Sequence, residues 1–194
     1  MANATEEARA PGRPRRPGVG DAVIAATVEL MTAHGYERTT IDEIARSSGV
    51  AKTTIYRRWR SKGELAIDAL VRVLGEPPVA SSASESALRD TISWLGARIR
   101  ESKVRSLLAG LVTEAAWDAE LRGQLRERIR EPFVRRVVQD WRLVARDVDL
   151  VFDIVVGGLL HRLAMTGDIT AEDTAAFTAA ATGPLFGRRS SHRR

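Results

Sequence analysis

The fold is decided by residues Thr39–Leu65, which read TTIDEIARSSGVAKTTIYRRWRSKGEL. Apolar residues at helical spacing precede Gly49, and Ile55 and Trp59, four residues apart, form the apolar face of a second helix. Gly49 can adopt the positive φ that a sharp turn between two helices needs. The stretch therefore predicts two short helices that pack against each other across a tight turn.

The second of these helices presents a polar, positively charged face to its surroundings. Residues 52–62 contain five positive charges and no negative charge. Side chains of these types contact base edges in the major groove of DNA or hold its phosphates. We predict base contacts from Lys52, Thr53, Thr54 and Arg57, and phosphate contacts from Thr40, Tyr56, Arg58 and Lys62.

Two capping patterns set the limits of these helices. Thr40-x-x-Glu43 has the spacing of a capping box, which begins the first helix by pairing amide groups that would otherwise lack a partner. Ser61-x-x-Glu64 repeats that spacing, so the DNA-reading helix is expected to end just before it. The free amides at this next helix start, together with Lys62, predict a phosphate clamp.

An amphipathic helix is predicted over Asp21–His34, closed by Gly35, and a fourth helix over Lys62–Leu74. In this order, GYERTTIDEIA, GVAKTTIYRRW and SKGEL resemble the tetracycline-repressor (TetR) family of regulators. The resemblance covers roughly residues 21–74. It implies an all-α protein, in which a three-helix DNA-binding domain is joined by a linking helix to a helical body that dimerises and binds an effector.

Composition agrees with an all-helical protein of 194 residues. No segment alternates as a strand would, there is no cysteine, and no apolar stretch is long enough to span a bilayer. We expect a cytoplasmic protein without a membrane partner, cofactor or metal site. An enzyme on a helical scaffold is the weaker alternative, because three histidines and no phosphate loop or nucleophile elbow give catalysis little support.

Four regions are predicted along the chain. Residues 1–18 form a basic arm that is disordered when free, residues 19–75 the DNA-binding domain, residues 76–187 the body, and residues 188–194 a basic tail. The arm either remains a solvated tail or follows the DNA with Arg13, Arg15 and Arg16. The net charge of +5 is thus concentrated at the DNA-binding end and in the two tails.

Five helices are expected in the body. The first begins at the cap Ser82-x-x-Glu85 and reaches about Arg100, and the second covers Val104–Trp117. A long third helix from Leu121 to Val144 is expected to kink at Pro132, which removes one backbone hydrogen bond. The last two are predicted at Asp149–Thr166 and Thr170–Phe186.

The last two helices predict a dimer interface. Residues 150–165 are apolar on nearly all sides, which one packing face does not explain, and the glycine pair 157–158 suggests a close backbone approach. Burial inside a monomer is the alternative. The resemblance also implies a four-helix bundle of two helices per subunit. The interface residues expected are Ile154, Gly157, Gly158, His161, Ala176, Ala179 and Ala180.

The resemblance further implies an effector pocket in the body. The candidate lining residues, each of which could equally be ordinary core, are Trp94, Leu107, Leu111, Phe133, Trp141, Phe152 and His161. His161 could instead cap a helix or lie at the dimer interface. The expected function is a homodimeric repressor that binds double-stranded operator DNA and is released by an apolar small molecule. A dimeric regulator without an effector is the alternative. Residues 62–74 are expected to be the only element shared by both units.

Overall fold

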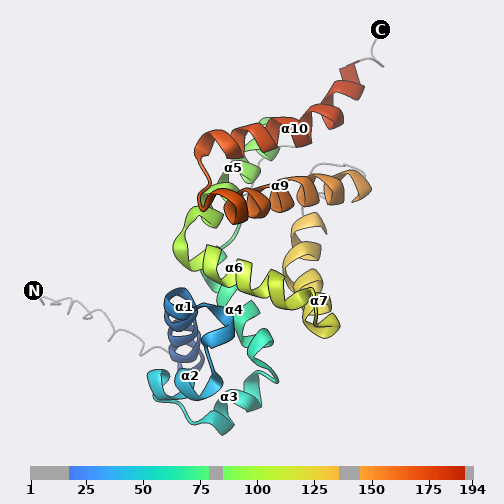
Figure 1. The fold of residues 1–194 in the computed structure, drawn as a ribbon. Helices are drawn as coiled ribbons and strands as arrows, with labels where there is room; N and C mark the ends of the chain where they lie inside the picture. Colours follow the sequence, from blue (N-terminus) through green and yellow to red (C-terminus); the bar gives the residue numbers. More distant parts are fainter. Residues whose placement is uncertain (1–17, 79–84, 136–144, 191–194) are drawn as a thin grey trace, which may run out of the picture.

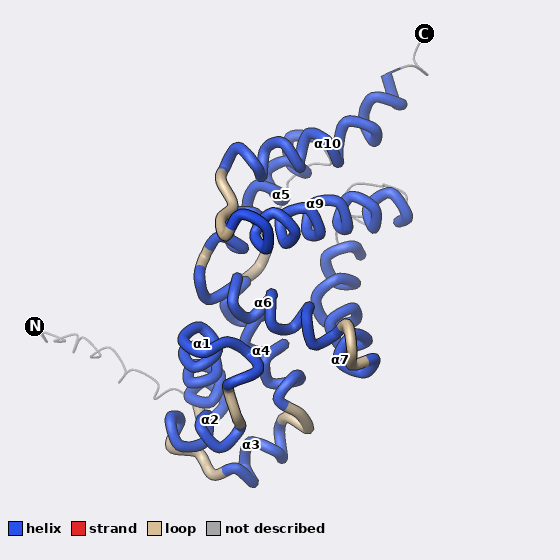
Figure 2. The backbone as a smooth tube through the Cα atoms, in the orientation of Figure 1, coloured by secondary structure: helices blue, strands red, loops and turns tan. Residues whose placement is uncertain are grey.

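The computed structural model describes residues 18–78, 85–135 and 145–190, and every regular element within these ranges is a helix. Helices α1 to α4 lie at one end of the molecule, α6 crosses the middle, and α5, α9 and α10 form the other end (Figures 1 and 2). None of the described helices is long and apolar enough to cross a membrane. The predicted all-α fold class is confirmed.

The N-terminal unit consists of α1 (Val19–Arg38), α2 (Ile41–Ser48) and α3 (Lys52–Arg58). Gly35 interrupts the helical backbone of α1 with a φ of 80°, and Gly49 ends α2 in the left-handed region with a φ of 68°. Both breaks are where the sequence predicts them, because glycine adopts these angles without strain. The helices enclose a small core of Val23, Ala26, Ile41, Ile44, Ile55, Trp59 and Leu65.

Helix α4 (Lys62–Leu74) follows directly and begins at Ser61, whose hydroxyl accepts a hydrogen bond from the Glu64 amide at 3.0 Å. The carboxylate of Glu64 returns to the amide of Arg60 at 2.7 Å rather than to that of Ser61. The predicted cap is therefore present, but its reciprocal bond is shifted by one residue. Gly75 ends the helix with a φ of 73°.

Helix α6 (Ser102–Ala115) packs against both α1 and α4 and joins the N-terminal unit to the body. Gly110 makes this contact possible, since a Cβ atom there would lie 2.4 Å from Cβ of Tyr36 on α1. The expectation that α4 alone belongs to both units was wrong. The terminal turn of α1 is equally part of this shared core, because Tyr36 is buried in it.

The far end of the body is formed by α5 (Glu85–Arg100), α9 (Ala145–Thr166) and α10 (Ala171–Ser190). Their core includes Ile92, Ile99, Val151, Val155, Leu159 and Ile169. Arg98 of α5 reaches back to α4, where it donates to the carbonyl of Leu74 at 2.9 Å and to that of Val73. This side chain therefore pairs carbonyl groups at the C-terminal end of α4 that have no partner within the helix.

The predicted long helix from Leu121 to Val144 falls within the described residues only as far as residue 135. Asp118 caps α7 (Ala119–Leu125), which passes into a π-helical turn, Arg126–Arg130, and then into helical residues 131–135. In this turn the amide of Glu131 donates to the carbonyl of Arg126, directly before Pro132, which has no amide proton to continue an α-helical ladder. The distortion predicted for Pro132 is thus a π-helical turn. Residues 136–144, including Trp141, lie outside the described ranges.

Candidate nucleic-acid interface and ligand cavity

Helix α3 carries the candidate DNA contacts on its outer face, at the far end of the molecule from α10 (Figure 1). Its inner face is fixed by Ile55, which is fully buried, and by Trp59, the residue that ends the helix. This packing leaves Lys52, Thr53, Tyr56, Arg57 and Arg58 exposed and Thr54 half-buried. Three of the four predicted base-contacting residues on α3, Lys52, Thr53 and Arg57, are thus open to solvent.

Lys52 is held by an acidic neighbour on α2. Its ammonium lies 2.8 Å from a carboxylate oxygen of Asp42, and this hydrogen bond raises the pKa of Lys52. Both side chains are about half exposed or more, so the pair is weak and exchangeable. A phosphate or guanine that binds Lys52 either replaces Asp42 or shares the three N–H donors of the ammonium with it.

Thr40 performs the capping function that its spacing predicts. The Glu43 amide donates to the Thr40 hydroxyl at 3.2 Å, and the carboxylate of Glu43 accepts from the Thr40 amide at 2.9 Å. The bond from the backbone of Thr40 lowers the pKa of Glu43. Thr40 remains exposed at the start of α2, and its predicted phosphate contact remains a prediction.

Arg58, although exposed, and the half-buried Lys62 both contact neighbouring residues of the chain. The Arg58 guanidinium lies over the Trp59 ring, 5.6 Å from its centroid, and so close to Gly20 that a Cβ atom there would clash with it. Lys62 donates to the Tyr36 carbonyl at 2.9 Å and lies 4.2 Å from the centroid of the Tyr36 ring. Burial lowers the pKa of Lys62. Lys62, the first residue of α4, therefore links α4 to the end of α1.

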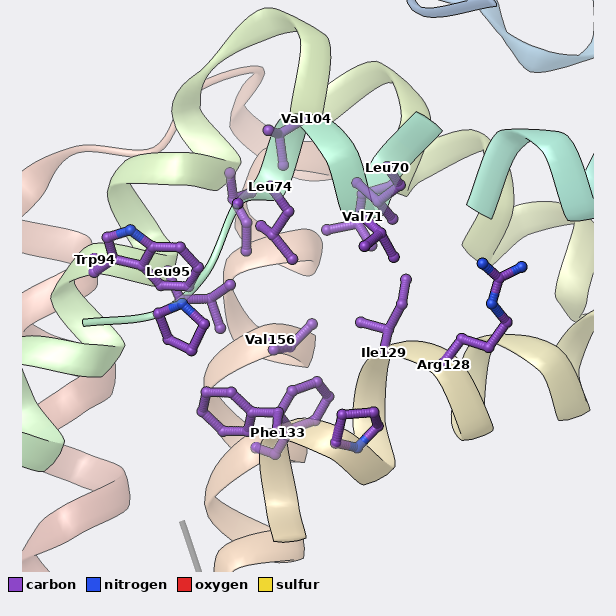
Figure 3. Close-up of a pocket in the computed structure, with 16 residues that line it drawn as sticks. Leu70, Val71, Leu74, Trp94, Leu95, Val104, Arg128, Ile129, Phe133 and Val156 are labelled. Carbon is purple, nitrogen blue, oxygen red and sulfur yellow. The ribbon is translucent and has the colours of Figure 1, made fainter. Parts of the chain in front are cut away.

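A cavity of about 200 Å³ lies between α4, α5, α6, α9 and the segment 128–133 (Figure 3). Trp94, Phe133 and Phe152, which the sequence singles out, are among its lining residues. The lining residues that sequence reasoning missed or assigned to ordinary packing are Leu70, Val71, Leu74, Gly75, Pro77, Leu95, Ile99, Val104, Leu108, Arg128, Ile129, Pro132 and Val156. The feature of the sequence that could have indicated these residues is the apolar face at the C-terminal end of α4.

Three other predicted pocket residues are not at this cavity. Leu107 and Leu111 are fully buried in the core that joins α1, α4, α6 and α7, because α6 turns that face toward the N-terminal unit. His161 is exposed on α9 and is absent from the residues that line the cavity. Leu107 and Leu111 therefore belong to the packed core, and His161 belongs to the surface of α9. Trp141 lies outside the described residues.

Helices α9 and α10 leave apolar and small residues exposed. On α9 these are Leu150, Ile154, Gly157 and Met165, which form one stripe with the exposed polar residue His161, each three or four residues from the next. On α10, Ala176, Ala179 and Ala180 are exposed. Gly158 differs from Gly157, because a Cβ atom there would lie 2.5 Å from the ring of Phe177 on α10 of the same chain. The close approach predicted for Gly158 is therefore made within the subunit.

The described residues contain no cluster of histidine, cysteine or carboxylate side chains that could hold a metal ion. What they do contain is a helix-turn-helix unit with an exposed cationic second helix, fused to a helical body with an apolar cavity. This arrangement defines a helix-turn-helix DNA-binding protein.

Comparison with known proteins identifies the family. Residues 23–69 match the model of the bacterial regulatory proteins of the tetR family. The chain is 30% identical over 162 residues to the HTH-type transcriptional regulator Mb1581 of Mycobacterium bovis, covering 78% of this chain and 79% of that protein. It is 26% identical over 159 residues to the DNA-binding transcriptional repressor TetR of Mycobacteroides abscessus, covering 76% and 83% of the two chains.

A similar solved structure is that of the putative transcriptional regulator SCO7518 from Streptomyces coelicolor, with a TM-score of 0.65 and 19% identity. The match covers 86% of this chain and 99% of that one. The chain belongs to the tetR family of bacterial regulatory proteins and is a DNA-binding transcriptional regulator.

Proposed function

We propose that this regulator is a homodimeric repressor that reads a two-fold symmetric operator with α3 and leaves it when an apolar molecule fills the cavity. The observation that carries the proposal is the location of the cavity. Leu70, Val71 and Leu74 of α4 line it, while Lys62 at the other end of α4 is bonded to α1 of the DNA-binding unit. One rigid helix therefore contacts both the ligand space and the unit that carries α3.

Repression is supported by the relative from Mycobacteroides abscessus, which is a DNA-binding transcriptional repressor. Within α3 we assign base contacts to Lys52, Thr53, Thr54 and Arg57, since their side chains lie at the start of the helix or on its outer face. Phosphate contacts are assigned to Thr40, Tyr56 and Arg58. Lys62 is proposed to support the interface by bracing α1 against α4, and its direct phosphate contact stays a prediction.

The dimer proposal rests on the exposed stripe of α9. Leu150 is 58% exposed and Met165 is 69% exposed, and both lie on the stripe that contains Ile154 and Gly157. An apolar stripe of this length on a helix otherwise packed in the body is suited to a second copy of the same helix. A two-fold dimer would also place two α3 helices on one DNA duplex, which is how such proteins reach specific affinity.

The ligand proposal rests on the chemistry of the cavity wall. Three aromatic rings and a set of aliphatic side chains line a partly open volume of about 200 Å³, which exceeds the roughly 150 Å³ of a cavity that accommodates benzene. A tilt of α4 caused by a ligand would change the distance between the two α3 helices. Specific binding needs that distance near one turn of DNA, about 34–36 Å.

The experiment compares Leu74→Trp, which fills the cavity with a side chain, with the wild type in operator binding. Trapping the ligand-filled arrangement is expected to weaken operator affinity at least about tenfold, a coupling of about 1.4 kcal/mol. Val112→Trp serves as the control, because Val112 is exposed on α6 and does not line the cavity. Unchanged affinity in a folded Leu74→Trp protein would favour the alternative, a dimeric regulator without an effector.

A further inference from the structure

The wall of the cavity contains one feature that an apolar ligand does not need. Among the described residues that line it, Arg128 alone carries a charge. Figure 3 shows its aliphatic stem at the rim beside Ile129 and its guanidinium turned away from the centre of the cavity, toward α4. The side chain belongs to the π-helical turn Arg126–Arg130, whose neighbours Ile129, Pro132 and Phe133 form the wall itself.

The guanidinium of Arg128 has its partner on α4. It donates a hydrogen bond to one carboxylate oxygen of Asp68, and the other oxygen of Asp68 accepts from the indole nitrogen of Trp59 at 2.5 Å. Trp59 ends α3 and is buried in the core of the DNA-binding unit. A single carboxylate thus connects the cavity rim to the end of the DNA-reading helix.

From this geometry we propose that the ligand of the cavity is an apolar monocarboxylate whose carboxylate takes Arg128 from Asp68. The inference rests on the proposed function and specifies the chemistry of its effector. Arginine binds carboxylates through two parallel hydrogen bonds, and both competing acceptors here are carboxylates. The exchange therefore replaces one ion pair by another and leaves no guanidinium unpaired.

The exchange also explains how a ligand bound in the cavity would affect the DNA-binding unit. In the structure, the Asp68–Arg128 pair joins the middle of α4 to the π-helical turn, and the two side chains are 28% and 37% exposed. Once Arg128 is paired with the ligand, α4 loses this attachment to the body. Asp68 keeps its bond to Trp59, so α4 and α3 can move together.

The test measures binding of straight-chain and phenyl-substituted carboxylic acids of six to twelve carbons, each beside its neutral amide of the same shape, by calorimetry. The acids are expected to bind wild-type protein at least about tenfold more tightly than their amides, the gain of a charge-assisted hydrogen bond. Arg128→Gln is expected to remove that preference. Arg126→Gln is the control, because Arg126 lies on the same turn, pairs with Glu131 and does not line the cavity.

A second variant is expected to strengthen the binding of acids instead of weakening it. Asp68→Asn keeps an acceptor for Trp59 but removes the charge that competes for Arg128, so acids are expected to bind it several-fold more tightly than they bind the wild type. Absence of any preference for acids over amides in the whole series, or the same preference in Arg128→Gln, would overturn the inference. So would weaker acid binding by Asp68→Asn.

DNA release separates this inference from the proposed function. If acids and amides release the operator equally well, the effector response stands and the role of Arg128 is refuted. If acids bind through Arg128 and the operator stays bound, the ligand class stands and the proposed response to it is refuted.

Discussion

The ammonium of Lys62 lies over the ring of Tyr36, 4.2 Å from its centroid, and donates to the carbonyl of the same residue. Tyr36 in turn fits against Gly110 of α6. Tyr36 thus contacts three helices at one point, namely the end of α1, the start of α4 and the middle of α6. We infer that the DNA-binding unit moves with the body at this point, and that any ligand-driven change pivots around it.

Tyr36 provides a pH test of this joint. Burial, with smaller contributions from Glu114 and Asp118, raises the pKa of Tyr36 from its ordinary value of 10.0 to about 12. Because the folded-state pKa is higher, the contribution of Tyr36 to stability is complete below pH 10 and is lost as the pH rises toward 12. We expect the stability difference between wild type and Tyr36→Phe to shrink over that range, as measured by denaturant unfolding. A constant difference would contradict the buried phenol.

The glycine pair of α9 predicts two opposite effects on stability. Gly158→Ala places a methyl group against the ring of Phe177 and is expected to cost about 1–3 kcal/mol. At Gly157 the added methyl group meets no atom of its own subunit within 4 Å, so within the subunit Gly157→Ala is expected to be neutral or to stabilise the helix by up to about 1 kcal/mol. Thermal unfolding at a fixed protein concentration compares the two. Equal losses at both positions would show that the packing of α9 on α10 is misassigned.

The same stripe predicts how the dimer can be broken. Gly157→Glu puts a charge on the proposed interface without disturbing the subunit, so we expect the protein to sediment as a monomer at micromolar concentration. Gly123→Glu is the matched control, because Gly123 on α7 also has open space around it and lies outside the proposed interface. A dimer that survives Gly157→Glu would place the interface elsewhere.

The pair of Lys52 and Asp42 predicts a gain of DNA affinity. Asp42→Asn removes a negative charge beside α3 and frees Lys52, so binding to operator and to random DNA is expected to tighten several-fold, with a steeper dependence on salt. In the double variant with Lys52→Met the gain should disappear. Fluorescence anisotropy over a salt series measures both. If Asp42→Asn weakens binding, the carboxylate has a role in recognition that its ion pair does not indicate.

The sequence predicted local features of the DNA-binding unit well. The caps at Thr40 and Ser61, the breaks at Gly35 and Gly49, and the end of α3 at Trp59 depend on side chains and backbone angles within a few residues. Such signals can be read from one chain because their physical causes are local.

The cavity could be predicted only in part, because it depends on how helices face one another. Leu107 and Trp94 are both apolar residues on amphipathic helices, yet Leu107 packs toward α1 and α4 while Trp94 lines the cavity. Periodicity identifies the buried face of a helix and not the neighbour it meets. The position of Arg128 at the cavity could not be predicted from the sequence, because it is one of 30 basic residues and its partner Asp68 is 60 positions away.

A dimer that reads DNA with two copies of α3 should select a two-fold symmetric site, and selection of bound sequences from a random DNA library measures this. We predict enrichment of one palindrome, whose half-sites are spaced for two α3 helices on the same face of the duplex. The Arg57→Ala protein should select a site with relaxed preference at one position of each half-site, because a good bidentate contact contributes about 1–3 kcal/mol of discrimination. Enrichment of an asymmetric site, or an unchanged palindrome with Arg57→Ala, would contradict the account.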